Sequence, residues 1–261
     1  MIDEPYRWLE AIANRREYIQ DQLKGGSPIM LVSYDSGLLL ATIGREHQKL
    51  FEVYDRIAFS AIGHPADIEK LRLLGINDAH VEGFTRATED VSVRRIVNFV
   101  VSPTVKASFE QIFAAPFIVR MLFAELGESD EEDIVCKIDY DGSFRVKSGS
   151  ENSYLFDVVA GTPQLESAMI DWLKDKLGDR RLSRDEALEL ALEAWIVARH
   201  TTLEGEGDKL EVRLPQNFDA RKALREEVKT GTIEAAVLDR SRPEDSKFTR
   251  LTEKEFRDVL K

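Results

Sequence analysis

The stretch Ile29-Met-Leu-Val-Ser-Tyr34, Asp35-Ser36, Gly37-Leu-Leu-Leu-Ala-Thr-Ile43 decides the fold class. Two short apolar runs are joined by a two-residue turn, and Gly37 can adopt the positive φ that a tight hairpin favours. The runs are almost continuously apolar instead of alternating, which is typical of strands covered on both faces. We therefore predict a buried β-hairpin whose faces are covered by helices.

The segments on either side of this hairpin also have a regular pattern. Upstream, residues 4–24 predict a helix: Pro5 suits a first helical position, apolar residues recur at three- and four-residue steps, and Gly25-Gly26 ends the pattern. Downstream, residues 50–54 and 56–62 predict two more strands. The first sheet is therefore expected to contain the hairpin and these two strands.

The remainder of the chain repeats this order of strands and helices. Helices are expected from Pro65 and over 91–113 with a kink at Pro103, then from Thr162-Pro163, from the capping box at Ser183 and from the capping box at Thr252. Further strands are expected at 117–125, 134–140, 144–147 and 154–160, which we assign to the second sheet, and at 210–214, 233–238 and 248–251, which close it. The order predicts an α+β fold: a four-layer αββα sandwich of two antiparallel sheets between two helix layers, forming one domain over 1–261.

Composition excludes several classes of partner. The 261 residues carry a net charge of −12, which repels nucleic acid and anionic membrane surfaces. The single Cys136 excludes a disulfide framework and favours a reducing compartment. The acidic N-terminus does not have the pattern of a signal peptide, and no apolar run nears the length of a membrane span. A cytoplasmic protein is expected.

Three segments resemble the proteasome family, in particular its bacterial α-type subunits. They are Lys49-Leu-Phe-Glu-Val-Tyr-Asp-Arg-Ile-Ala-Phe-Ser-Ala-Ile-Gly63, the junction Gly161-Thr162 and the stretch Glu234-Ala-Ala-Val-Leu-Asp-Arg-Ser-Arg-Pro-Glu-Asp-Ser-Lys-Phe-Thr-Arg-Leu251. The charged helix before the first strand is similar to that of α-type subunits, whereas β-type subunits carry a cleaved propeptide there. The resemblance implies the N-terminal nucleophile hydrolase fold, which is the same αββα sandwich.

The resemblance also implies how catalysis would be organised. Active β subunits use a freed N-terminal Thr as nucleophile, together with an Asp and a Lys, and the matching positions are Ser27, Ile43 and Lys49. Ile43 carries no charge, so the network that would order the lysine is absent. No catalytic residue is therefore predicted. The alternative is a self-processed peptidase of the same family with Ser27 as its N-terminal nucleophile.

No other catalytic or metal-binding pattern is present. The four histidines lack the paired spacing that places two imidazoles on one helix face, and no P-loop or nucleophile-elbow motif occurs. The acidic run 128–133 fits a solvated loop better than a cation site, because calcium loops need alternating ligands and a central glycine. No metal ion and no cofactor are expected.

What the resemblance implies is a non-catalytic α-type subunit of a bacterial proteasome core particle. It would form a heptameric ring with copies of itself, cap a chamber of β-type subunits, gate substrate entry and dock a ring-shaped ATPase activator through the activator's C-terminal tail. Lys49 would bind that tail, although it could also be an ordinary lysine that flanks a strand. A free-standing adaptor is a third possibility, and it would not form a seven-fold ring.

The resemblance further divides the N-terminal region, 1–24, from the sandwich, 27–261. The gate would be the polar segment before the helix, unless that segment is only a frayed terminus. Its residues are Met1, Ile2, Asp3, Glu4, Pro5 and Tyr6. Neighbouring subunits would contact Trp8, Leu9 and Ile12, for which local packing is the alternative.

Overall fold

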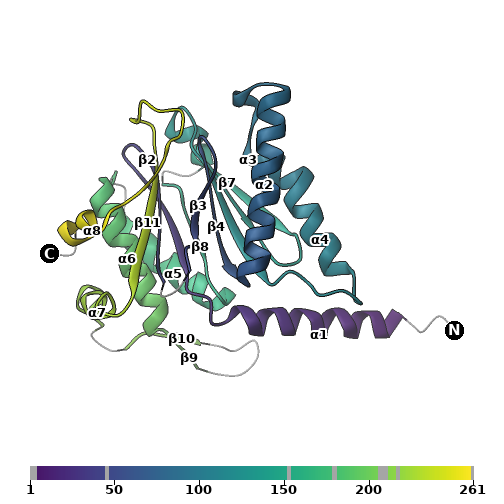
Figure 1. Ribbon diagram of the computed structural model, residues 1–261. Coiled ribbons are helices and arrows are strands. Elements are labelled where there is room, and N and C mark those ends of the chain that lie inside the picture. The colour runs from purple at the N-terminus through teal and green to yellow at the C-terminus, as the bar shows by residue number, and fades with distance from the viewer. Residues whose placement is uncertain are drawn as a thin grey trace.

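The computed structural model describes residues 5–44, 47–151, 154–177, 181–204, 211–215 and 218–259. Two five-stranded antiparallel sheets lie between helices (Figure 1). One sheet has the order β12-β11-β2-β1-β8: Phe248–Arg250, Thr232–Asp239, Gly37–Gly44, Ile29–Tyr34 and Phe156–Val159. The other has the order β3-β4-β5-β6-β7: Leu50–Tyr54, Ile57–Gly63, Val119–Glu125, Ile134–Ile138 and Phe144–Ser148.

The predicted hairpin is confirmed as β1 and β2, which pair from Met30 with Ala41 to Tyr34 with Gly37. Gly37 has the predicted positive φ, 159°, and the neighbouring strand gives a second reason for a glycine at this position. A Cβ atom on Gly37 would lie 1.9 Å from the carbonyl oxygen of Leu238 in the neighbouring strand β11. Only glycine leaves room for β11 to pair with β2 as far as this turn.

Side-chain alternation along β2 explains why the hairpin has no polar face. Leu38 and Leu40 point into a core between the two sheets, where they meet residues of β5. Leu39 and Ala41 point the other way, toward the helices α5 (Pro163–Leu177) and α6 (Arg184–His200). A third core joins the outer face of the second sheet to α2 (Pro65–Thr85). The four-layer αββα sandwich is therefore confirmed.

The assignment of strands to sheets was wrong. The strands predicted at 117–125, 134–140 and 144–147 extend the sheet of β3 and β4, whereas the hairpin pairs with β8 and β11. The segment predicted at 210–214 closes no sheet. Its strand β10 (Glu211–Arg213) pairs with β9 (Thr202–Glu204) in a separate two-stranded ribbon. Local periodicity identifies a strand but does not identify its distant partner.

The helices follow the predicted order with local differences. The helix expected over 91–113 consists of α3 (Val93–Ile96), a π-helical turn (Val97–Val101) and α4 (Ser102–Glu110). The π-helical turn lies directly before Pro103, whose ring disturbs the regular helical ladder. The capping box at Ser183 is confirmed. The helix predicted from Thr252 is α8 (Glu253–Val259), whereas α7 (Ala220–Glu227) was not predicted.

A buried ion-pair network ties the second sheet to β8 and α5. Glu166 of α5 lies 2.7 Å from the guanidinium of Arg120 and 2.8 Å from the ammonium of Lys137. Lys137 also lies 3.6 Å from Asp157, and Arg120 donates to the carbonyl of Ala160 at 2.7 Å. All four charged side chains are nearly inaccessible to water. Loss of one partner would leave an uncompensated buried charge.

We therefore predict that Glu166→Ala lowers the free energy of unfolding by about 3–5 kcal/mol. Urea denaturation of the isolated chain followed by tryptophan fluorescence measures this loss. The matched control is Glu69→Ala, because the Glu69–Arg72 pair is partly exposed and is expected to contribute at most about 1 kcal/mol. Equal losses in the two variants would contradict the structural role of the network.

Candidate functional site

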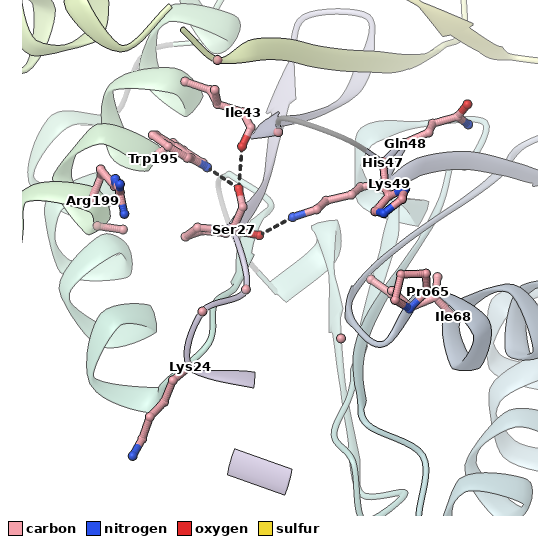
Figure 2. Close-up of a pocket in the computed structure, with 18 of the residues that line it drawn as sticks. Lys24, Ser27, Ile43, His47, Gln48, Lys49, Pro65, Ile68, Trp195 and Arg199 are labelled. Carbon is pink, nitrogen blue, oxygen red and sulfur yellow. Dashed lines mark hydrogen bonds between the residues drawn. The ribbon is translucent and has the colours of Figure 1, made fainter. Parts of the chain in front are cut away.

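A pocket of about 760 Å³ lies where the first helix meets the sandwich. Helix α1 (Pro5–Leu23) ends beside it, and the pocket wall includes the residues before β1, the end of β2, the residue before β3 and one face of α6. Figure 2 shows Ser27 at its centre, with Trp195 on one side and Lys49 on the other. The structure thus brings together, in one pocket, the three positions that the resemblance matched to a catalytic site: Ser27, Ile43 and Lys49.

The hydroxyl of Ser27 contacts three groups. It donates to the carbonyl oxygen of Ile43 at 2.6 Å and accepts from the indole Nε1 of Trp195 at 3.0 Å (Figure 2). Its oxygen also lies 3.3 Å from Oγ1 of Thr42. The Ser27 proton therefore points at a main-chain carbonyl, which is not a base. The sequence analysis did not identify Trp195 as a residue of this site.

Lys49 enters the pocket as a cation without a counterion. Its Nζ donates to the carbonyl oxygen of Ser27 at 3.1 Å, and no carboxylate of the described residues lies within ion-pair distance of that atom. Burial lowers the pKa of Lys49 to about 8, and the nearby Glu234 opposes this shift. The ammonium is therefore partly desolvated, and the carbonyl of Ser27 is its one hydrogen-bond acceptor among the described residues, so it retains hydrogen atoms for a ligand.

Glu234 fixes the backbone of Lys49 without pairing with its side chain. The carboxylate of Glu234, on β11, accepts from the main-chain N–H of Lys49 at 2.9 Å and from that of Leu50 at 2.8 Å. The start of β3 is thereby anchored to the other sheet. In the sequence, Glu234 is the one acidic residue of an otherwise apolar predicted strand. Such a residue often has a specific partner, but the sequence analysis did not consider it.

The position that matches the catalytic aspartate is part of the core. Ile43 is 3% exposed and packs with the helices α5 and α6. The neighbouring Thr42 donates from its hydroxyl to the carbonyl of Pro28 at 2.6 Å, so it too is engaged with the backbone. The position that matches the aspartate is thus apolar, and the carboxylates that line the pocket, Glu69 and Glu227, come from α2 and α7. The geometry suits capture of an anion and lacks the groups that nucleophilic catalysis requires.

The junction before Ser27 continues directly from α1. The main-chain N–H of Gly26 donates to the carbonyl of Leu23 at 2.9 Å, which closes the last turn of the helix. A Cβ atom on Gly26 would lie 3.0 Å from that same carbonyl oxygen and 3.2 Å from Ile62. This glycine is explained by a tight connection between helix and strand, as the turn residues predict.

The predicted contact and gate residues lie at the other end of α1. Trp8 and Leu9 are 51% and 64% exposed, whereas Ile12 is partly buried against the core between the sheets. Of the predicted gate segment, Met1, Ile2, Asp3 and Glu4 lie outside the described residues, and Pro5 and Tyr6 form the first residues of α1. Ile12 therefore has a packing role within its own chain.

The acidic run is not simply a solvated loop. Asp133 is 1% exposed and lies 2.5 Å from the guanidinium of Arg240, which also contacts Asp130 at 3.0 Å. Arg240 thus binds this loop to the residues that follow β11. In the part of the chain that the structure describes, no cluster of His, Cys, Asp and Glu side chains is arranged to hold a metal ion, and no helix has the length and apolarity of a membrane span.

Comparison with known proteins places these features in context. The family model described as "Proteasome subunit" matches residues 39–212, which include Lys49. Relatives named proteasome subunit alpha include that of Streptomyces scabiei, 28% identical over 96% of this chain and 89% of the relative. Those of Streptomyces coelicolor and Streptosporangium roseum are 29% and 31% identical over 93% of this chain and 83% and 80% of theirs.

The geometry around Ser27 predicts that the chain is not processed. During prolonged incubation at neutral pH, residues 1–26 are expected to stay attached, because the Ser27 hydroxyl donates to the main-chain carbonyl of Ile43 and not to a base. Intact-mass spectrometry of the purified chain, with Ser27→Ala as the control, measures this. A fragment that begins at Ser27 in the unmodified chain and is missing in the variant would contradict the assignment.

Proposed function

Because the chain belongs to the proteasome subunit family, we propose that it forms the outer, heptameric ring of a bacterial proteasome core particle in the cytoplasm. Its relatives are α subunits, and it is itself a non-catalytic α-type subunit. In this proposal catalysis belongs to partner β-type subunits. The ring admits unfolded chains, and a ring-shaped ATPase delivers them.

One observation carries the proposal: the pocket retains the lysine but has lost the carboxylate and the free nucleophile. Ser27 is tied to Ile43 and Trp195, and Ile43 is part of the core. The half-buried ammonium of Lys49 remains in the pocket. The alternative, a peptidase with Ser27 as nucleophile, would need cleavage before Ser27 to free its α-amine as the base, and Ile43 offers no carboxylate to order Lys49.

Lys49 is proposed to receive the terminal carboxylate of the activator's tail. A half-buried ammonium with spare donors gains a charge-assisted hydrogen bond from an incoming carboxylate, and no carboxylate of the described residues forms an ion pair that would compete. The anchoring of its backbone by Glu234 fixes where the side chain starts. Such a contact contributes about 1.5–3 kcal/mol.

We predict that Lys49→Met weakens binding of an activator tail by about tenfold to a hundredfold. The probe is a fluorescent peptide with the C-terminal sequence of the ring-shaped ATPase from the same organism, titrated with assembled rings. The matched control is Lys106→Met, which removes an exposed lysine on α4. Unchanged affinity in Lys49→Met would contradict the assignment.

The same titration has a pH dependence that distinguishes Lys49 from a surface lysine. The free pocket loses its charge as the pH rises through the lowered pKa of Lys49, about 8, so affinity is expected to fall between about pH 7 and pH 9. A surface lysine would keep its charge over this range. A flat profile in the unmodified protein would contradict capture by Lys49.

Contact between copies of the chain is proposed to involve the exposed start of α1. Arg15 holds the middle of this helix to the end of α4, donating to the carbonyls of Ser108 at 2.8 Å and Ala114 at 2.9 Å. The N-terminal end of α1 runs away from the sheets (Figure 1). Trp8 and Leu9 lie on that end and are largely exposed, so a second copy of the chain can cover them.

Trp8→Ala combined with Leu9→Ala is therefore predicted to weaken ring formation by about tenfold or more, because truncation removes a large apolar contact. Native mass spectrometry over a dilution series measures the fraction of heptamer. Tyr18→Ala is the matched control, since Tyr18 is an equally exposed aromatic residue of the same helix. Rings as stable as those of the control would contradict the contact.

The gate is proposed to be the segment Met1 to Tyr6. Its last residues, Pro5 and Tyr6, begin the helix whose start is expected at the subunit contact, and its polar sequence suits a plug that opens easily. Deleting these residues is predicted to speed hydrolysis of a short fluorogenic peptide by assembled particles severalfold. Unchanged rates, with the particle still intact by native mass spectrometry, would contradict the gate.

A further inference from the structure

A second cation lines the same pocket at the end opposite Lys49. Arg199 lies on α6, one helical turn beyond Trp195, and Figure 2 shows both residues on the same side of Ser27, away from Lys49. Its side chain is exposed, and no carboxylate of the described residues pairs with it. Arg199 is therefore available to bind an anion that enters the pocket.

The other charged groups of the pocket wall are already engaged. Lys24 forms an ion pair with Asp21 at 2.5 Å, and Glu69 forms one with Arg72 at 2.7 Å. Glu227, the other acidic residue of the wall, has an interaction of its own. Lys49 and Arg199 thus remain as two cations that an incoming ligand can neutralise.

The spacing of these cations suits a peptide. Lys49 donates to the main chain of Ser27, and Trp195 donates to its side chain, so a single residue separates Lys49 from α6. Arg199 lies one helical turn beyond Trp195 on α6. The Cβ atoms of residues four apart on a helix are about 5–6 Å from each other. Because an extended chain spans about 3.3 Å per residue, about two or three residues bridge the two cations.

Resting on the proposed function, we infer that Arg199 is a second anion-binding group that selects activator tails with an acidic side chain about two or three residues before the terminal carboxylate. The terminal carboxylate binds Lys49 and the acidic side chain binds Arg199. The wall between them is largely apolar, with Leu165, Trp195 and Ala198, and would contact the intervening part of the tail. The pocket would then distinguish tails by the presence of both carboxylates and by the distance between them.

Matched peptides test this inference. Short fluorescent peptides with a free C-terminal carboxylate, carrying either Glu or Gln at the third residue from the end, are titrated with assembled rings at low salt. The Glu peptide is expected to bind about two- to fivefold more tightly, as for a partly exposed ion pair. Arg199→Gln should abolish this preference and leave affinity for the Gln peptide unchanged. Arg145→Gln, which changes an exposed arginine on β7, should preserve the preference.

The outcomes separate this inference from the proposed function. Equal binding of the two peptides that still depends on Lys49 would overturn the role of Arg199 and keep tail capture. A preference for Glu that persists in Arg199→Gln would also overturn it, because the acidic side chain would then bind elsewhere. Failure of both peptides to bind the unmodified rings would contradict the proposed capture itself, and with it the inference.

Discussion

The whole architecture depends on one constraint: the hairpin of β1 and β2 is apolar on both faces and must be covered twice. One face packs on the second sheet through Leu38 and Leu40, and the other packs on α5 and α6 through Leu39 and Ala41. The second sheet in turn has an outer apolar face, which α2 covers, so four layers result. The pocket lies at the end of this hairpin, where α1 reaches β1 and where β2 ends.

Much of the fold follows from short-range pattern. The hairpin, the helix before it and the capping box at Ser183 were predicted because turn residues and apolar spacing act locally. The partition of strands between the sheets was not predictable in this way. Pairing of β2 with β11 depends on Gly37 leaving room for Leu238, a contact between residues far apart in the chain.

In the candidate site, too, some residues could be predicted from the sequence and others could not. Ser27, Ile43 and Lys49 could be named in advance because the resemblance fixes their positions. Trp195 and Arg199 could not, since both reach the pocket from α6 and neither belongs to a recognisable motif. Glu234 lies in a stretch that resembles the family, but its contact with the backbone of Lys49 joins residues far apart in the chain. The residue at Ile43 has the largest chemical effect, because its apolar side chain leaves the pocket without the carboxylate that the resemblance places there, and we propose that the pocket binds an anion at Lys49 instead.

Cryo-electron microscopy of particles assembled from this chain and a partner β-type subunit tests the account most directly. We expect seven-fold rings of this chain at the outer ends of the particle, with residues before Ser27 continuous with β1 and the Lys49 pocket opening on the outer face. Density for this chain in the inner rings, beginning at Ser27, would contradict the account and make the chain a catalytic subunit.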